Sequence, residues 1–451
     1  MAKIAAPAGS NRIYDQQAMA HKLFRVAFGF ALVVYAVVLV ILQNQHLNTQ
    51  TTTIVDFPVI VEKVTALGQS VPVSNDVHND NATASETIAG YTALFYRPAS
   101  IILQNPKLPE WVKNYVAWHR EQRARFLDAK RNNSSSADDV KFLIYRCLQF
   151  DVCGGASDRL QDLPYKMMIA NQTNRVLLVV WEKPVPLETF LVPPEDGIDW
   201  SMQGEMHDML KDLEWHNKGD EYKSTLQIVS AVRMTDAAPL FRKYEADVVG
   251  HKIYHEIFRL LFTPSKALAE RVEATMKSLE LIPSQYSSVH LRVKYPQHGI
   301  VEESFSFHDH KAKVVEWARN AVNCAVELHP NSTIYVSSDN NDTIGYLLED
   351  SPFAQHYIDA TTHNKPPIVK LAARDYSKEN AHIAFSLNAG IDGYMSAFED
   401  LIIMGMGKCV AHGPGGYGRL GAALCGGECV VAHQGRHSKV CSDALTKTID
   451  S

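Results

Sequence analysis

The sequence predicts an α/β protein with two domains that face each other across a cleft, behind an N-terminal transmembrane helix and a stem. Between residues 142 and 181, a strand-like run, a glycine turn, a helical pattern and a second strand-like run follow one another, as in a parallel βαβ unit. Residues 289–433 repeat this alternation several times. Near the N-terminus, Val26 to Leu42 is an apolar run without any charged residue, which is enough for a short membrane span.

The predicted transmembrane segment, residues 26–42, also indicates where the rest of the chain lies. The basic residues that precede it are Lys3, Arg12, Lys22 and Arg25. The next one is Lys63, so the positive-inside rule places residues 1–25 in the cytosol and everything after residue 43 in a lumen. A cleaved signal peptide is the alternative, although its n-region would be unusually long and no small-residue cleavage site follows it. We expect a single-pass type II protein of the Golgi or endoplasmic reticulum membrane, because a short span suits thinner membranes.

The composition is that of a globular protein. The chain has 451 residues, of which 46% are hydrophobic and 21% are charged, so it can bury the cores of two domains. Its formal charge of −6 argues against a general nucleic-acid binder. In a lumen, N-x-S/T sequons become possible glycosylation sites. Those at Asn132 and Asn133 overlap in a polar loop and are the most accessible; the others are Asn81, Asn171, Asn331 and Asn341.

All seven cysteines follow residue 146, and an oxidising lumen would pair some of them. The odd number leaves at least one free or intermolecular. Cys147 and Cys153 flank one glycine turn, and Cys425 and Cys429 flank another, so either pair can form a disulfide. The spacing lacks two CxxC units, which argues against a zinc site. The full connectivity does not follow from the sequence.

The first part of the lumenal chain, residues 43–135, is expected to be a stem and a helical lead-in, with a helix over Trp111–Lys130. The N-terminal domain follows at 136–280. Its expected elements are strand Phe142–Cys147, helix Asp158–Gln172 with a kink at Pro164, strand Val176–Trp181 and a mostly helical segment over 200–285.

The C-terminal domain is expected over residues 281–451, with a junction between the domains near 265–285. Its expected strands are Val289–Val293, Ile334–Ser337, Ile368–Ala372, Lys408–Ala411 and Cys429–His433. Its expected helices are Asp309–Leu328, Ile344–Glu349, Tyr394–Met406 and one that begins near Leu420.

Ligands of such sheets bind at the carboxyl ends of the strands, and polar or glycine-rich residues follow four of the expected strands. The stretch from Asp400 to Gly426 has helix, strand, glycine turn and helix in succession, which suits an anion at a helix N-terminus. The alternative is a tight connection without a ligand. In Cys153–Leu160, two glycines precede a helix that begins with Ser157, Asp158 and Arg159, so that Asp158 or Arg159 can reach the cleft. The alternative is that Ser157 or Asp158 caps the helix.

The two remaining strand ends carry charge. Side chains alternate between the two faces of a strand, so His290 and Arg292 are expected on the same face of Val289–Val293. The guanidinium fork of Arg292 suits a diphosphate. The alternative is a salt-bridged arginine at a sheet edge. Ser337, Ser338, Asp339 and Asn340 follow the next strand, either as ligand contacts or as the cap of the next helix.

Taken in order, four segments resemble the motifs of the fucosyltransferase superfamily, which joins the α1,2-, α1,6- and protein O-fucosyltransferases. They are CGGASDRL (153–160), SVHLRV (288–293), IYVSSDN (334–340) and DLIIMGMGKCVAHGPGGYGRLGAAL (400–424). The resemblance covers roughly residues 145–435. It implies a GT-B fold of two Rossmann-like domains and GDP-fucose as the donor substrate, with no other cofactor and no metal.

The resemblance also implies roles for individual residues. Arg292 would clamp the β-phosphate, His290 would contact the nucleotide, and Asp400 would accept from the guanine edge. Backbone N–H groups of the last turn would hold the pyrophosphate. The expected donor-site residues are His290, Arg292, Asp339, Asp400, Gly415, Gly416, Tyr417, Gly418, Arg419, Gly154 and Gly155.

The chain departs from the family where Gly415-Gly416 replaces a frequent serine, and where residues 293–295 lack a carboxylate. The expected catalytic residues are therefore Arg292 and, as the base, Glu302, Glu303 or Asp158.

The resulting hypothesis is a lumenal enzyme that transfers fucose from GDP-fucose to a glycan or glycoprotein, with inversion and without a metal. Two alternatives remain open. The chain can be a carbohydrate-binding pseudoenzyme that has lost its base, or the same fold can use another nucleotide sugar.

Overall fold

A computed structural model describes residues 97–148, 153–210, 253–294, 307–349, 370–377, 390–434 and 438–441, and the backbone of 216–217 and 226–230. The chain divides into two compact units after His78, and every described residue lies in the unit Asn79–Ser451. The predicted transmembrane segment and residues 43–96 of the predicted stem lie outside the described residues. Within the described ranges, no helix is both long and apolar enough to cross a membrane.

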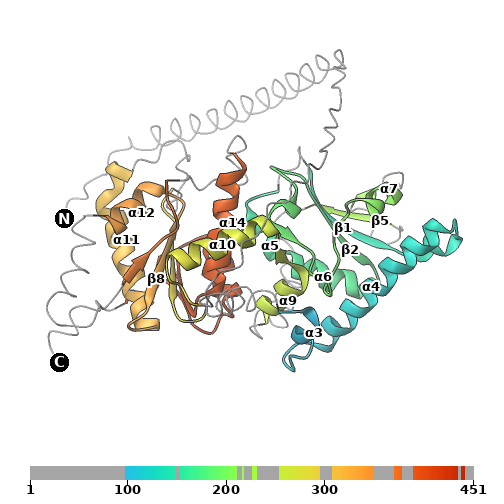
Figure 1. Cartoon of the computed structure of the whole chain (residues 1–451), viewed down its shortest axis with the longest axis horizontal. Coiled ribbons are helices and arrows are strands. Elements are labelled where there is room, and N and C mark those ends of the chain that lie inside the picture. Colours follow the sequence, from blue (N-terminus) through green and yellow to red (C-terminus); the bar gives the residue numbers. More distant parts are fainter. Residues whose placement is uncertain are drawn as a thin grey trace, which may run out of the picture. The chain divides into compact units, whose positions relative to one another are not determined.

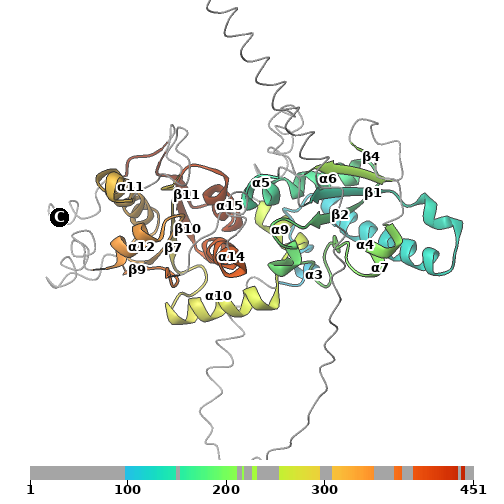
Figure 2. The same cartoon turned by 90° about the horizontal axis from the view of Figure 1, so that it is seen from above.

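The N-terminal half is built on a parallel sheet in the order β2-β1-β5-β4. Figure 1 labels β1, β2 and β5, and Figure 2 labels β4. Strands β1 (Phe142–Cys147) and β2 (Val176–Trp181) have the predicted bounds and pair in parallel. The described part of 200–285 is mostly helical, as predicted, but it also contains strands β4 (His216–Asn217) and β5 (Leu226–Ser230), which the prediction missed. A short apolar run such as LQIVS has too few residues for its period to distinguish a buried strand from a helix.

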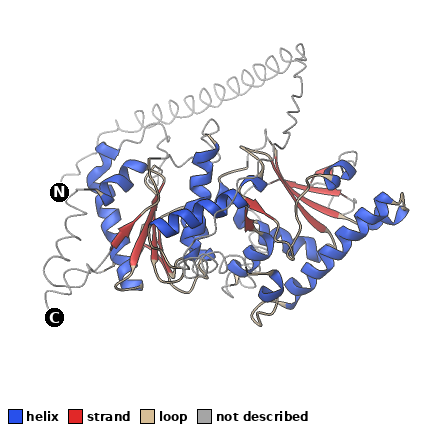
Figure 3. Ribbon diagram, in the orientation of Figure 1, coloured by secondary structure: helices blue, strands red, loops and turns tan. Residues whose placement is uncertain are grey.

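Helices flank this sheet on both sides (Figure 3). The described helices of this half are α3 (Ala99–Ile102), α4 (Glu110–Arg131), α5 (Ala156–Gln161), α6 (Leu163–Gln172), α7 (Glu205–Leu210) and α9 (Tyr254–Leu261). The predicted helix 158–172 is divided at Asp162, and Pro164 lies in the first turn of α6. Proline fits there because the first N–H groups of a helix have no partner within it. Shorter elements are η1 (Ser135–Asp139), η2 (Leu187–Thr189), and the antiparallel pair β3 (Leu191–Val192) and β6 (Thr263–Pro264).

The C-terminal half has a parallel sheet in the order β11-β10-β7-β8-β9 (Figure 2). Its strands are β7 (Ser287–Leu291), β8 (Thr333–Ser338), β9 (Lys370–Ala372), β10 (Cys409–His412) and β11 (Val430–Ala432). Its helices are α11 (Phe307–Leu328), α12 (Asn341–Leu348), α14 (Ile391–Met406) and α15 (Gly416–Leu424). All these elements were predicted within a few residues, although β7 ends before Arg292 and leaves that arginine in the following loop.

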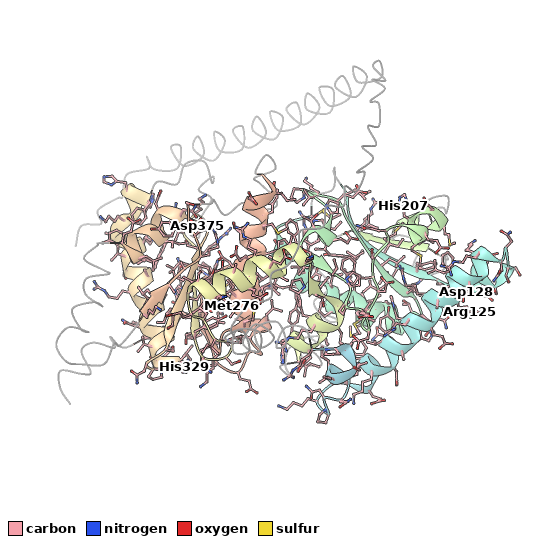
Figure 4. All side chains as sticks on the ribbon, in the orientation of Figure 1. Arg125, Asp128, His207, Met276, His329 and Asp375 are labelled. Carbon is pink, nitrogen blue, oxygen red and sulfur yellow. A yellow bond between two sulfur atoms is a disulfide. The ribbon has the colours of Figure 1, made fainter. Side chains whose placement is uncertain are left out.

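The two halves share one hydrophobic core, which includes Leu160 of α5, Phe190, Phe398 of α14 and Leu420 of α15. Phe190 and Phe398 stack with their ring centroids 4.2 Å apart. Helix α10 (Lys266–Ser278) lies at the predicted junction and contacts α14, where Arg271 donates to Ser396 at 2.7 Å and to Glu399 at 2.5 Å. Met276 of α10 is buried in the same core (Figure 4).

Three disulfides join Cys147 to Cys153, Cys324 to Cys441 and Cys409 to Cys429, and Cys425 is free. The predicted alternative of a Cys425–Cys429 bridge is wrong, whereas the Cys147–Cys153 bridge is confirmed. Cys429 precedes β11 and Cys409 begins β10, and parallel pairing of these strands brings their Cα atoms to 4.7 Å. The prediction chose Cys425 as the partner of Cys429 because the two are close in sequence. The pairing of β10 with β11 instead places Cys409 beside Cys429.

We expect the protein to become less stable in mild acid, because two buried histidines resist protonation in the folded state. His119 of α4 and His433 are 0% and 2% exposed, and burial lowers the pKa of each from 6.5 to about 4. Between pH 6.5 and 4 the unfolded chain binds protons at these sites and the folded chain does not. Unfolding free energy should therefore fall as the pH drops through this window, by about 2 kcal/mol per histidine at pH 4.5. Urea unfolding at pH 7 and pH 4.5 measures the change.

The matched variants for this prediction are His119→Gln and His207→Gln. His207 is exposed on α7 (Figure 4), so its replacement should leave the pH dependence unchanged. His119→Gln should remove about 2 kcal/mol of the pH-dependent loss, which is the share of that one histidine, whatever it does to stability at pH 7. An equal loss between the two pH values in His119→Gln and wild type would refute this assignment.

Candidate functional site

Two glycine turns, one from each half, meet at the starts of α5 and α15. A Cβ on Gly416, the first residue of α15, would lie 2.7 Å from Ser157 Oγ of α5. Gln161, the last residue of α5, donates from Nε2 to the Gly416 carbonyl at 2.6 Å. A side chain at position 416 would therefore have to displace the Ser157 hydroxyl, so the close approach of the two helices favours glycine there. The structure thus places Ser157, Asp158 and Gln161 of α5 beside Gly416 of α15, and their sharing of one ligand site stays a prediction.

The first turn is held by its own helix. Gly154 has a φ of +72°, and Gly155 caps α5 while Asp158 Oδ2 accepts from its backbone N–H at 3.1 Å. The capping interpretation of Asp158 is therefore correct. Its other oxygen, Oδ1, would lie 3.5 Å from a Cβ on Gly416, so the same carboxylate also faces the second turn.

Arg159 does not reach a cleft, contrary to one sequence-based expectation. It is fully buried, its Nε donates to the Gly154 carbonyl at 3.1 Å, and its guanidinium lies 4.4 Å from the Trp181 ring centroid. Burial lowers its pKa to about 10. Arg159 therefore stabilises the first glycine turn through its hydrogen bond to the Gly154 carbonyl.

The second turn has a backbone conformation that only glycine adopts readily. Gly415 has φ 92° and ψ 173° and caps α15. The first N–H groups of a helix have no partner within it, so α15 presents donors and the positive end of its dipole here. The Arg419 side chain folds back and donates from Nε to the Gly415 carbonyl at 3.1 Å, and the Tyr417 hydroxyl donates to the Ala397 carbonyl. The hydroxyl proton of Tyr417 is therefore already engaged within the protein.

His290 lies beneath the start of α15, at the carboxyl end of β7. Its ring centroid is 5.2 Å from that of Tyr417, and a Cβ on Gly418 would lie 2.6 Å from its Nδ1. Burial, followed by the charge of Arg292, holds the pKa of His290 well below its usual value. The ring is therefore neutral at physiological pH and supports α15 through contact with Gly418.

Arg292 and Asp339 form an ion pair after the ends of β7 and β8. Arg292 Nη1 lies 3.1 Å from Asp339 Oδ2, and the arginine side chain remains 17% exposed. Asp339 Oδ1 also accepts from the N–H of Val293 at 2.7 Å. The salt-bridge interpretation of Arg292 is therefore correct, and the pairing fixes the guanidinium at the edge of the sheet. The neighbouring Asn340 caps α12, with Oδ1 accepting from Thr343 N at 2.8 Å.

Asp400 of α14 belongs to a buried cluster that the sequence did not reveal. Its Oδ1 accepts from the Tyr335 hydroxyl at 2.5 Å and from Arg374 Nε at 3.1 Å, and its side chain is 2% exposed. Burial raises the pKa of Tyr417, and the nearby charge of Asp400 raises it further. The predicted contact of Asp400 with a guanine stays a prediction, and it would have to form beside this ion pair.

Sequence reasoning missed further polar residues at the same edge. His412 ends β10 and its Nδ1 lies 2.9 Å from the Gly413 carbonyl, which fixes the proton on Nδ1. His433 Nε2 donates to the His290 carbonyl at 3.0 Å, and Gln434 Nε2 donates to the Arg292 carbonyl at 3.4 Å. His412 ends β10, and His433 and Gln434 follow β11 within two residues, so the strand-end rule that had selected Arg292 would have found them.

Two predicted residues, Glu302 and Glu303, lie outside the described residues. Over the ranges that the structure does describe, no group of three or more His, Cys, Asp or Glu side chains could hold a metal ion.

Comparisons with known proteins find similarity among solved structures. No protein-family profile and no curated protein sequence matches this chain. A mutant of Arabidopsis thaliana FUT1 in complex with GDP is similar with 12% identity and a TM-score of 0.46, over 71% of this chain and 78% of that one. NodZ α-1,6-fucosyltransferase co-crystallised with GDP is similar with 14% identity and a TM-score of 0.39, over 63% and 92%. NodZ from Bradyrhizobium, in another structure, is similar with 14% identity and a TM-score of 0.38.

Proposed function

We propose that this chain is a membrane-anchored, lumenal glycosyltransferase that transfers fucose from GDP-fucose to a glycan or glycoprotein acceptor. The observation that carries the proposal is the meeting of two glycine turns beside a fixed arginine at the carboxyl edge of a parallel sheet. A helix start and a guanidinium together suit a diphosphate. The choice of GDP-fucose rests on the four sequence motifs, and the lumenal address rests on residues 26–42.

The proposed chemistry stabilises a leaving group. Departure of GDP from the sugar leaves negative charge on the β-phosphate, and the N–H groups at residues 416–418 would face that charge. Arg292, oriented by Asp339, would supply the second contact. Because both groups are already fixed in place, they need little reorganisation during the reaction, and they act without a metal ion.

The acceptor hydroxyl must lose a proton as it attacks the anomeric carbon from the face opposite GDP, which gives inversion. Asp158 is the described carboxylate that suits this role, because Gly155 holds its Oδ2 while Oδ1 faces the second turn. Glu302 and Glu303 remain candidates of the same chemistry.

Nucleotide binding tests the donor assignment. A nucleotide at one hundred times its Kd should raise the unfolding free energy by about 2.7 kcal/mol, because only the folded chain binds it. We expect this stabilisation with GDP and with GDP-fucose, both in the presence of EDTA, and a smaller one with UDP or CMP. Thermal unfolding of the full chain measures it. Stabilisation by UDP alone would replace the guanine assignment by another nucleotide sugar.

Transfer is tested by the release of GDP from GDP-fucose with and without a mixture of glycan acceptors. The proposal expects acceptor-dependent release that survives EDTA. Tight binding of GDP without acceptor-dependent release would instead favour a carbohydrate-binding protein that keeps the fold.

A further inference from the structure

We infer that Gln161, from the N-terminal half, is a positioning residue for the phosphate-binding turn of the C-terminal half. The inference rests on the proposed function, because it assigns Gln161 to the same anion site. Gln161 Nε2 donates to the Gly416 carbonyl at 2.6 Å, across a separation of 255 residues. The donor site is therefore completed by both halves, and the N-terminal half serves more than the acceptor.

The hydrogen bond from Gln161 to the Gly416 carbonyl helps to set the orientation of the peptide groups in the turn. A peptide unit is planar, and its C=O and N–H point in opposite directions. A fixed carbonyl on Gly416 therefore also fixes the direction of the Tyr417 N–H, one of the first-turn donors of α15. The turn needs such support because its neighbour Gly415 is a glycine at a positive φ of 92°, and glycine loses the most conformational freedom on ordering.

Gln161 can orient the turn because its own helix is held firmly. At the start of α5, Asp158 accepts from Gly155 N and Arg159 donates to the Gly154 carbonyl. At its end, the Tyr254 hydroxyl donates to the Leu160 carbonyl at 3.1 Å. The Cys147–Cys153 disulfide joins the residue before Gly154 to the end of β1. A continuous set of bonds thus links the N-terminal sheet to the phosphate turn.

The role predicts a defect that depends on the β-phosphate. Replacement of Gln161 by methionine keeps the length of the side chain and removes the donor. Loss of one such hydrogen bond should weaken GDP binding on the order of fivefold. GMP lacks the β-phosphate, so its affinity should change less than twofold. Gln161→Glu places an acceptor opposite the Gly416 carbonyl and should weaken GDP binding further.

Calorimetric titration of the full chain with GDP and GMP tests this, with Gln172→Met at the exposed end of α6 as the control. The inference fails if Gln161→Met binds GDP as tightly as wild type, or if both nucleotides weaken by the same factor, which is the mark of a general structural defect. Wild type that bound neither nucleotide would overturn the proposed function instead.

Amide hydrogen exchange separates the two failures, because it needs no nucleotide. In Gln161→Met the N–H groups of residues 415–418 should exchange several times faster than in wild type and in Gln172→Met. Unchanged exchange at these residues would show that Gln161 does not position the turn.

Discussion

Replacement of Arg292 by alanine should lower kcat/KM for the donor by a factor of 10² to 10³, about 3 to 4 kcal/mol of transition-state stabilisation. The expectation follows from its position. Arg292 directly follows β7, and its Nη1 lies 3.1 Å from Asp339 Oδ2, which orients the guanidinium. The arginine side chain remains partly exposed. No other described arginine is both exposed at this sheet edge and oriented by a carboxylate from the neighbouring strand end. Steady-state release of GDP at varied donor concentration measures the loss.

The controls for Arg292→Ala distinguish chemistry from net charge. Arg319→Ala removes an exposed arginine from α11 and should leave kcat/KM unchanged. Arg292→Lys keeps the charge and loses the fork, so its activity should fall between those of alanine and wild type. Activity of Arg292→Ala within threefold of wild type would remove Arg292 from the catalytic role.

Gly415→Ala is expected to weaken GDP binding at least tenfold. The φ of 92° and ψ of 173° at Gly415 fall in a region that is essentially reserved for glycine, where a side chain costs about 1–3 kcal/mol. A Cβ there would meet nothing within 4 Å, so the effect is one of backbone strain and not of steric overlap. The turn would relax to another conformation and redirect the first N–H groups of α15. Calorimetric titration with GDP measures the loss.

Gly427→Ala is a matched control for this variant. Gly427 also has a positive φ, +67°, with nothing within 4 Å of its Cβ, and it follows the opposite end of α15. Both variants should lose some unfolding free energy, while Gly427→Ala should bind GDP normally. Equal losses of GDP affinity in both variants would show that backbone strain weakens binding by destabilising the fold, and not by changing the glycine turn at Gly415.

Much of the fold follows from local sequence. Strands β1 and β2 have their predicted bounds because each is a mainly apolar run of strand length, uninterrupted in β2 and broken only by Arg146 in β1. The C-terminal strands are similarly bounded. Strand β5 was missed because its run is equally compatible with a helix, and only pairing with β1 decides between them. The Cys409–Cys429 pair likewise depends on a register that no local pattern contains.

The sequence could propose single residues for the candidate site, but it could not show the contacts between them. The sequence singled out both glycine turns, Arg292 and Asp339 because they follow expected strands or match the motifs, and their roles in a site stay predictions. The Arg292–Asp339 pair depends on β7 and β8 being neighbours, and the Gln161–Gly416 bond depends on contact between the halves. Arg374, the partner of Asp400, follows the edge strand β9, and its importance emerges only from the buried cluster around Tyr335.

The central claim is that the two glycine turns and Arg292 form a single diphosphate site. A crystal structure of the chain with GDP tests it most directly. The account predicts the β-phosphate within hydrogen-bond distance of the N–H groups at residues 416–418 and of the Arg292 guanidinium. GDP bound with its phosphates away from both would contradict the account, whatever the activity of the protein.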